Sequence, residues 1–208
     1  MRVILIRHGK TPGNEMKRHI GRTDESLSEG GRKSLCEKAA VFSDLKEVDP
    51  GKVMLFSSPK KRCKESAAIL FPWLVPQEIE DLTECDFGDF ENKNYKELSG
   101  NPDYQAWIDS GGTLPFPGGE DRGAFAGRSV RGFLKGMQQA KEAGAALGIF
   151  VVHGGSIMAV LEALGVPKKD YYDWQLKNGE YIEGEFDFQE GRIFVREKAT
   201  IGKESIVK

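Results

Sequence analysis

Two histidines and two arginines lie where buried strands are predicted to end. His8 follows the apolar residues 3–6 and Arg7, His153 follows the apolar residues 147–152, and each histidine precedes a glycine. Arg62 comes shortly after a third apolar run, in the first turn of a predicted helix. Because the carboxyl ends of parallel strands meet at one edge of a sheet, we expect these side chains to gather there. They would form a positive cluster in a chain of formal net charge −2.

A compact anion such as phosphate suits this cluster. Two guanidinium groups can hold phosphate oxygens in forked geometry, and a helix beginning at Gly154-Gly155 would offer free backbone N–H groups. A neutral imidazole can attack phosphorus, and nearby arginines favour the neutral form because they disfavour a further cation. Taken singly, each histidine could be a hydrogen-bonded structural residue and Arg62 a solvated helix charge. The combination predicts a phosphate site with a nucleophile in it.

The elements that must position these residues alternate between strands and helices. Residues 3–6, 53–56 and 147–152 are short apolar runs typical of buried strands, and residues 182–195 predict a closing hairpin. Helices are expected over residues 29–44, from Pro59 at the N1 position to before Pro72, over 122–142 and over 155–164. This order predicts a three-layer α/β/α fold with a mixed, mostly parallel central sheet. Residues 76–121 are irregular and aromatic, and predict a cap over a single domain spanning 1–208.

Composition excludes several classes of protein. The 39% hydrophobic fraction and the 25 glycines predict a globular protein with many tight turns. Thirty basic against 32 acidic residues argue against nucleic acid as a partner and against an anionic membrane surface. Three cysteines are an odd count without metal spacing, and the first apolar run is too short for a signal peptide, so a reducing cytoplasm is expected. The oligomeric state has no signature in the sequence.

A series of short blocks resembles the histidine phosphatase superfamily, also called phosphoglycerate mutase-like. The blocks follow the order of the family from residue 3 to about 160, and the small bacterial phosphatases described as α-ribazole phosphatases are similar in length. They are Arg7-His8-Gly9 with Thr11 and Asn14, Gly21-Arg22-Thr23-Asp24, Leu27-Ser28 with Gly31-Arg32, Ser58-Pro59 with Arg62, Glu84 with Gly88, Pro117-Gly118-Gly119-Glu120, and His153-Gly154.

The resemblance implies roles for these positions. His8 would be the nucleophile that becomes phosphohistidine, and Glu84 would protonate the leaving alcohol and later activate water. Residues expected to bind the phosphoryl group or the rest of the substrate are Arg7, Arg62, His153, Asn14, Gly21, Arg22, Thr23 and Gly154. On sequence alone Asp81, Asp86 and Asp89 compete equally with Glu84 for the proton-donor role. The implied chemistry needs no cofactor and no metal, and His19 has no partner at metal-binding spacing.

Three positions depart from the pattern of the family: Lys10 replaces an acidic residue or its amide, Ser26 a proline, and Cys63 a small residue such as alanine. None removes a catalytic group. A surface position is expected for Lys10 and a buried one for Cys63.

The spacing of the blocks bears on the reaction. Glu84 and His153 are only 69 positions apart, so the longer covering segment typical of mutases is missing. The sequence thus predicts a phosphatase for a small phosphorylated metabolite, such as α-ribazole 5′-phosphate or a sugar phosphate. The alternatives are a phosphoglycerate mutase and a phosphate-ligand or protein-binding module without catalysis.

Overall fold

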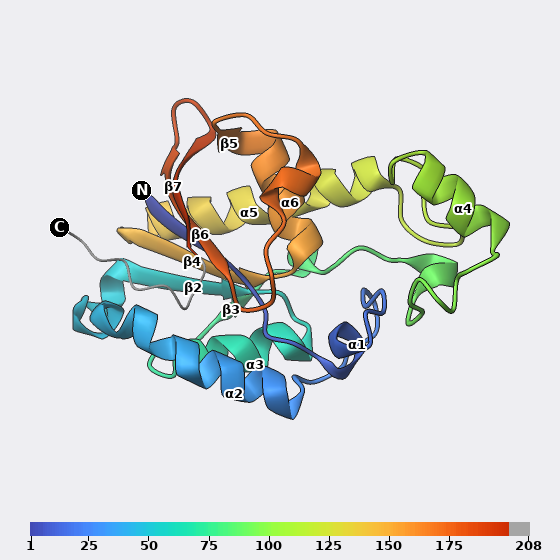
Figure 1. Cartoon of the computed structure of the whole chain (residues 1–208). Coiled ribbons are helices and arrows are strands. Elements are labelled where there is room, and N and C mark those ends of the chain that lie inside the picture. The colour runs from blue at the N-terminus through green and yellow to red at the C-terminus, as the bar shows by residue number, and fades with distance from the viewer. Residues whose placement is uncertain (200–208) are drawn as a thin grey trace.

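A sheet with helices on both faces forms the centre of the protein. The computed structural model describes residues 1–199, and its sheet has the strand order β3-β2-β4-β1-β6-β7-β5 (Figure 1). The strands are β1 (Arg2–Arg7), β2 (Val53–Ser57), β3 (Gln77–Glu78), β4 (Leu147–Val152), β5 (Gly165–Val166), β6 (Tyr181–Asp187) and β7 (Arg192–Ala199). Pairing is parallel among β3, β2, β4 and β1 and between β5 and β7, and antiparallel along β1-β6-β7. The mixed, mostly parallel sheet is confirmed.

The alternation of side chains along β1 shows why both faces need cover. Val3 and Leu5 join one apolar cluster, with α5 (Arg122–Glu142) and α6 (Gly154–Leu164), whereas Ile4 and Ile6 join the other. That second cluster packs against α2 (Glu29–Lys38) and α3 (Lys61–Leu70) on the opposite side (Figure 1). Because every side chain from Val3 to Ile6 is at most 2% exposed, the strand lies in the middle of a three-layer α/β/α fold.

The helix ends follow local signals, with two corrections. Ser28 caps α2 by accepting from the Gly31 amide at 3.0 Å, but α2 ends at Lys38 and continues as a 3₁₀ helix, Ala39–Glu47, rather than as α-helix to residue 44. Pro59 is not at N1 as predicted. α3 begins at Lys61, whose amide donates to the Asp24 carboxylate at 2.8 Å. A side chain from a distant segment therefore sets this helix start.

The region predicted as a cap starts inside the sheet, because β3 pairs with β2. Beyond it come two short 3₁₀ helices, Glu80–Leu82 and Gly88–Phe90, and α4 (Pro102–Asp109), which lies away from the sheet (Figure 1). Further short helices are α1 (Pro12–Glu15) and the 3₁₀ segments Pro50–Lys52 and Tyr171–Trp174. Phe90, Tyr104 and Trp107 pack edge to face or stacked with neighbouring rings. This aromatic packing joins the 3₁₀ helix Gly88–Phe90 to α4.

The carboxyl ends of β1, β2 and β4 meet at one edge of the sheet. Arg7 is in register with Val152, and Ser57 with Val151, so the residues that follow these strands lie side by side. Within residues 1–199, no helix has the length and apolar character needed to cross a membrane.

Candidate active site

The structure brings His8 and His153 together at this edge of the sheet. Their ring centroids are 5.2 Å apart, in a T-shaped arrangement, and their residues are 3% and 0% exposed. His8 donates a backbone hydrogen bond to Val152, which fixes one histidine beside the strand that carries the other. The prediction that both strand ends deliver an imidazole to one place is confirmed.

The ring of His8 has one nitrogen engaged by the backbone. Its Nδ1 lies 2.7 Å from the Gly9 carbonyl oxygen. A carbonyl only accepts, so in the neutral ring the proton is on Nδ1 and the lone pair on Nε2. Burial lowers the pKa of His8 well below its ordinary value, and the charges of Arg62 and Arg7 lower it further. At neutral pH this is an uncharged imidazole with a free lone pair on Nε2.

Arg62 is completely buried, and most of its N–H groups donate to backbone carbonyls. Its guanidinium donates to the carbonyls of Thr23 at 2.7 Å, Gly21 at 3.0 Å and Ile20 at 3.2 Å, and its Nε donates to His153 Nδ1 at 3.3 Å. The other nitrogen of His153 lies 2.8 Å from Ser58 Oγ. Since His153 Nδ1 accepts, Nε2 carries the proton of the neutral ring and donates to Ser58. Burial and the charge of Arg62 lower the pKa of His153 well below its ordinary value.

Arg7 has more donors to spare. Its Nη1 donates to the Leu176 carbonyl at 2.5 Å, while its buried Nε has no hydrogen-bond partner within the described part of the chain. A Cβ on Gly154 would lie 3.2 Å from Arg7 Cζ and Nε. The glycine after His153 therefore leaves room for the guanidinium to lie against the first turn of α6.

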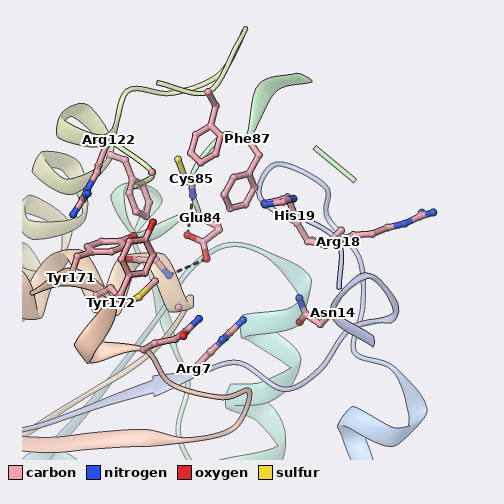
Figure 2. A pocket seen from close by; sticks show the side chains of 18 of the residues that line it. Arg7, Asn14, Arg18, His19, Glu84, Cys85, Phe87, Arg122, Tyr171 and Tyr172 are labelled. Atoms are coloured by element: carbon pink, nitrogen blue, oxygen red, sulfur yellow. Dashed lines mark hydrogen bonds between the residues drawn. The ribbon is translucent and has the colours of Figure 1, made fainter. Parts of the chain in front are cut away.

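Glu84 reaches the same hollow from the opposite side (Figure 2). Its carboxylate accepts from the amides of Cys85 at 3.0 Å and Gly155 at 3.3 Å, the second lying in the first turn of α6. A Cβ on Gly155 would come within 2.4 Å of Glu84 Oε1, so this glycine also makes space. Burial raises the pKa of Glu84, and hydrogen bonds and the arginine charges offset part of that rise.

The competing carboxylates are engaged elsewhere. Asp86 pairs with Arg22 at 3.0 Å and Asp81 with Arg131 at 3.6 Å, and Asp89 is exposed. None of the three lines the cavity, which leaves Glu84 as its acidic residue.

The cavity has a volume of about 310 Å³, and Glu84 points into it (Figure 2). It is lined by five of the residues predicted for the site: Arg7, His8, Asn14, Glu84 and Gly154. Its remaining wall is largely aromatic: His19, Phe87, Trp107, Phe116, Phe125, Tyr171 and Tyr172. No motif in the sequence marks Tyr171 and Tyr172 as part of a site. The sequence shows that residues 87–107 are rich in aromatic side chains but not that these line a cavity.

Other predicted site residues lie behind the wall. Arg62 and His153 do not line the cavity, because each is fully buried beneath it. Gly21, Arg22 and Thr23 do not line it either: the carbonyls of Gly21 and Thr23 hold Arg62, and the Arg22 side chain is 75% exposed. A Cβ on Gly21 would lie 1.9 Å from the Cys85 carbonyl oxygen, so this loop packs directly on the segment that carries Glu84.

The departures from the family pattern have ordinary places. Lys10 is exposed and does not line the cavity. Cys63 is fully buried in the cluster under α3, with Sγ 3.5 Å from His153 Nε2, and burial raises its thiol pKa to about 12. All three cysteines are free. Among residues 1–199 there is no group of three His, Cys, Asp or Glu side chains placed to hold a metal ion.

Known proteins similar to this chain include several phosphatases. The family model of the histidine phosphatase superfamily (branch 1) matches residues 3–198. A metal-independent phosphoserine phosphatase of Arabidopsis thaliana is 33% identical over 165 residues, which cover 76% of this chain and 66% of that protein. A glucosyl-3-phosphoglycerate phosphatase of Mycolicibacterium vanbaalenii is 30% identical over 175 residues, covering 80% of this chain and 75% of that protein.

Among solved structures, the fold matches the alpha-ribazole phosphatase from Shigella flexneri. The TM-score is 0.79 with 21% identity, over 99% of this chain and 100% of that one. At this identity the likeness concerns the fold.

Proposed function

Because this chain belongs to the histidine phosphatase superfamily, we propose that it is a metal-independent phosphomonoesterase that works through a phosphohistidine on His8. The observation that carries the proposal is the pairing of His8 with Glu84 across one cavity. Burial keeps the imidazole neutral with its Nε2 lone pair free, and the same burial favours the protonated form of the carboxyl. These are the forms that a nucleophile and a general acid need.

The reaction has two steps that exchange one proton with Glu84. In the first, His8 Nε2 forms a bond to phosphorus, the bond to the leaving oxygen breaks, and Glu84 gives its proton to that oxygen. In the second, the ionised Glu84 takes a proton from water while the water oxygen attacks phosphorus and the P–N bond breaks. Inorganic phosphate leaves, and His8 and Glu84 return to their starting forms.

The guanidinium groups supply the positive charge that this chemistry requires. Arg7 has donors free for the phosphoryl oxygens, and Arg62 contributes its charge and its one remaining N–H group from beneath. Fixed charges of this kind stabilise a phosphoryl group in the transition state. The Arabidopsis relative is by its name metal-independent, which supports the same proposal here.

The aromatic wall favours a leaving alcohol that carries a ring. The two arginines in this wall already have ion-pair partners: Arg122 pairs with Glu162 at 3.1 Å and lies over Tyr171, and Arg18 pairs with Glu97 at 2.8 Å. The buried Nε of Arg18 lacks a hydrogen-bond partner among residues 1–199. A substrate carboxylate, as in phosphoglycerate, would have to compete with these partners. Stacking on the aromatic side chains instead favours α-ribazole 5′-phosphate, with its benzimidazole ring, over a sugar phosphate or a mutase reaction. The three free cysteines agree with a cytoplasmic location.

The test is a phosphate-release assay in EDTA combined with rapid quench. We expect turnover with α-ribazole 5′-phosphate at a higher kcat/KM than with glucose 6-phosphate or 3-phosphoglycerate. Labelled substrate should leave an acid-labile, base-stable phosphoryl group on the protein, and His8→Ala should remove it.

Three results would count against the proposal. A wild-type protein that turns over substrate with no adduct in the quench would indicate direct attack by water. Loss of activity in EDTA that zinc or magnesium restores would refute metal independence. Binding of phosphate esters without any turnover would support the non-catalytic alternative.

A further inference from the structure

Glu84 sits in a segment that has almost no regular structure of its own. The 3₁₀ helix Glu80–Leu82 ends just before it, and another begins only at Gly88. The Glu84 carboxylate contacts two backbone amides, so its position depends on where that backbone lies. Something outside the segment has to hold residues 81–86 in place.

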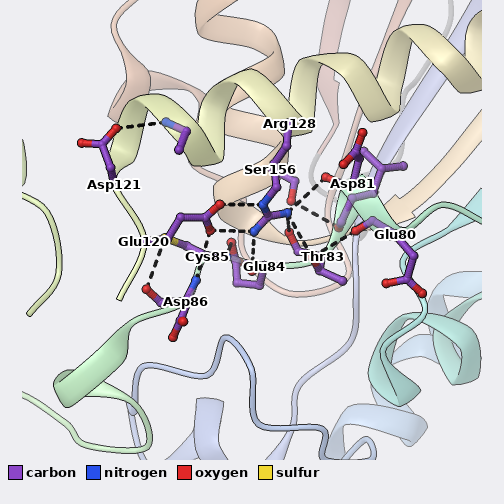
Figure 3. A network of polar contacts seen from close by, with 12 residues as sticks. Glu80, Asp81, Thr83, Glu84, Cys85, Asp86, Glu120, Asp121, Arg128 and Ser156 are labelled. Atoms are coloured by element: carbon purple, nitrogen blue, oxygen red, sulfur yellow. Dashed lines mark hydrogen bonds and ion pairs between the residues drawn. The ribbon is translucent and has the colours of Figure 1, made fainter. Parts of the chain in front are cut away.

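Arg128, on α5, makes those contacts (Figure 3). Its Nη1 donates to the carbonyls of Thr83 at 2.7 Å and Asp81 at 3.1 Å, and its Nη2 donates to the carbonyl of Glu84 at 2.9 Å. Nη1 also lies 3.0 Å from Thr83 Oγ1. Three backbone carbonyls on the approach to the proposed acid thus converge on one guanidinium group.

Glu120 holds Arg128 and the far side of the same segment. Its two carboxylate oxygens accept from Arg128 Nε at 2.7 Å and Nη2 at 2.8 Å, a forked ion pair whose side chains are 17% and 18% exposed. The backbone of Glu120 donates to the Asp86 carbonyl at 2.9 Å, and its Oε2 accepts from the Asp86 amide at 3.4 Å. The ion pair therefore forms hydrogen bonds to the backbone on both sides of Glu84 and Cys85.

The geometry points to the Arg128–Glu120 ion pair as a positioning device that sets the Glu84 carboxyl for proton transfer to the leaving group. This inference rests on the proposed general-acid role of Glu84. Neither residue lines the cavity, so both act through the backbone of residues 81–86 and not by touching substrate. It also gives a physical role to Glu120, the last residue of the Pro117-Gly118-Gly119-Glu120 block.

A lysine at position 128 could keep the positive charge but could not make the same set of hydrogen bonds. An ammonium group is a point donor, whereas this guanidinium group spans Glu120 and three carbonyls with a planar fork. In Arg128→Lys we expect the Glu84 carboxyl to be held less firmly in position. The reaction should then be slower, because small displacements of a reacting group reduce the rate strongly.

The test compares two esters that differ in their need for an acid. 2-Phenylethyl phosphate leaves as an alkoxide and requires a proton, while p-nitrophenolate is stable near neutral pH. With single-turnover phosphorylation as readout, Glu84→Gln should slow the alkyl ester by about 10² to 10⁴ and the nitrophenyl ester far less. Arg128→Lys should show the same selectivity, with a loss of about 10 to 10² on the alkyl ester and little change in KM.

Two further variants separate positioning from general damage. Glu120→Gln keeps the size of the side chain but weakens the ion pair with Arg128. It should give a smaller loss of rate than Arg128→Lys, again mainly with the alkyl ester, and it replaces Arg128→Lys in the test if that variant does not fold. Arg131→Lys is the matched control, because Arg131 lies one turn along α5, its side chain is 66% exposed, and it forms an ion pair with the half-buried Asp81 carboxylate at 3.6 Å. Its rates should equal those of wild type with both esters.

A double variant gives the sharpest readout. In a Glu84→Gln background, Arg128→Lys should add no more than about a threefold loss on the alkyl ester, because the group it positions is already gone.

The outcomes are distinct. Equal losses on both esters in Glu84→Gln would overturn the acid role, and the positioning role with it. A selective loss in Glu84→Gln, with a uniform loss or no loss in Arg128→Lys and Glu120→Gln, would overturn the positioning role alone.

Discussion

The two arginines of the site should respond differently to replacement by lysine. Arg62 makes four hydrogen bonds from a fully buried position, to three backbone carbonyls and to His153. A lysine ammonium has only three N–H donors, so at least one of the four acceptors is left buried and unpaired. At about 1–3 kcal/mol for each unpaired group, Arg62→Lys should lower the free energy of unfolding by at least about 1–3 kcal/mol.

Arg7→Lys removes much less structure. Within residues 1–199 the Arg7 side chain makes one hydrogen bond, to the Leu176 carbonyl, and its buried Nε lacks a partner. Its replacement should cost about 1 kcal/mol of stability, the net worth of one ordinary hydrogen bond. Both variants should lose kcat/KM, Arg7→Lys through the phosphoryl group and Arg62→Lys through the loop of residues 20–23.

The assay is urea unfolding at pH 7 alongside steady-state kinetics, with Lys61→Arg as a control for substitution on the exposed side of α3. If Arg62→Lys unfolds within 1 kcal/mol of wild type while activity is lost, the backbone contacts of Arg62 are not its main role. The direct forked contact with phosphate, predicted from the sequence, would then be the better account.

Two further predictions follow from the pKa shifts and from the close approach of glycines. Burial lowers the pKa of His8 and raises that of Glu84. The rate of phosphorylation by an alkyl ester should therefore increase with pH below pH 6.5, as His8 loses its proton, and decrease at higher pH, as Glu84 loses its own. In single-turnover measurements the decrease at higher pH should be absent in Glu84→Gln, and a decrease that persists in this variant would belong to another group. Gly155→Ala should push the Glu84 carboxyl aside, because the new Cβ would lie 2.4 Å from Oε1. The expected result is a selective loss on 2-phenylethyl phosphate, together with a lower thermal stability because the same Cβ would lie 3.0 Å from the buried Phe125 ring. Equal losses on both esters would contradict it.

Much of the fold could be predicted from the sequence because two features identify each central strand, an apolar run and the polar residues that follow it. Residues 3–6, 53–56 and 147–152 are apolar on both faces, and the polar residues after them mark the strand ends. Parallel pairing then forces Arg7, His8 and His153 to one edge, whatever the exact helix ends are. The helix of residues 122–142 could be predicted from the spacing of Val130, Phe133, Leu134 and Met137. Phe133 and Met137 are buried, whereas Val130 is half-buried and Leu134 is exposed.

The partners of the buried charges could not be predicted. The carbonyls that hold Arg62 belong to residues about 40 positions earlier in the chain, in a loop without periodicity. Arg128 looks like an ordinary residue of a helix surface, because its partners are backbone atoms of a distant irregular segment. Hydrogen bonds to carbonyls carry no side-chain signature, so such contacts leave no trace in residue types.

The choice of Glu84 among four nearby carboxylates shows what the structure adds to the family resemblance. Sequence spacing leaves Asp81, Asp86 and Asp89 equally available, whereas only Glu84 is placed on the cavity wall and against the first turn of α6. Its aim depends on glycines at 21 and 155, whose missing side chains let the Cys85 carbonyl and the Glu84 carboxylate come close. The position of the acid is therefore a property of backbone packing.

One physical cause gives both reacting groups their starting forms. Burial disfavours charge on any side chain, so it lowers the pKa of the His8 imidazole and raises that of the Glu84 carboxyl. The arginine charges then act in opposite senses on the two groups: they reinforce the neutral imidazole and partly offset the effect of burial on the carboxyl. A carboxyl held too firmly in its protonated form could not take a proton from water in the second step. In the proposed mechanism Arg7 and Arg62 would therefore serve both steps, because their charges reinforce the neutral form of His8 and favour ionisation of Glu84.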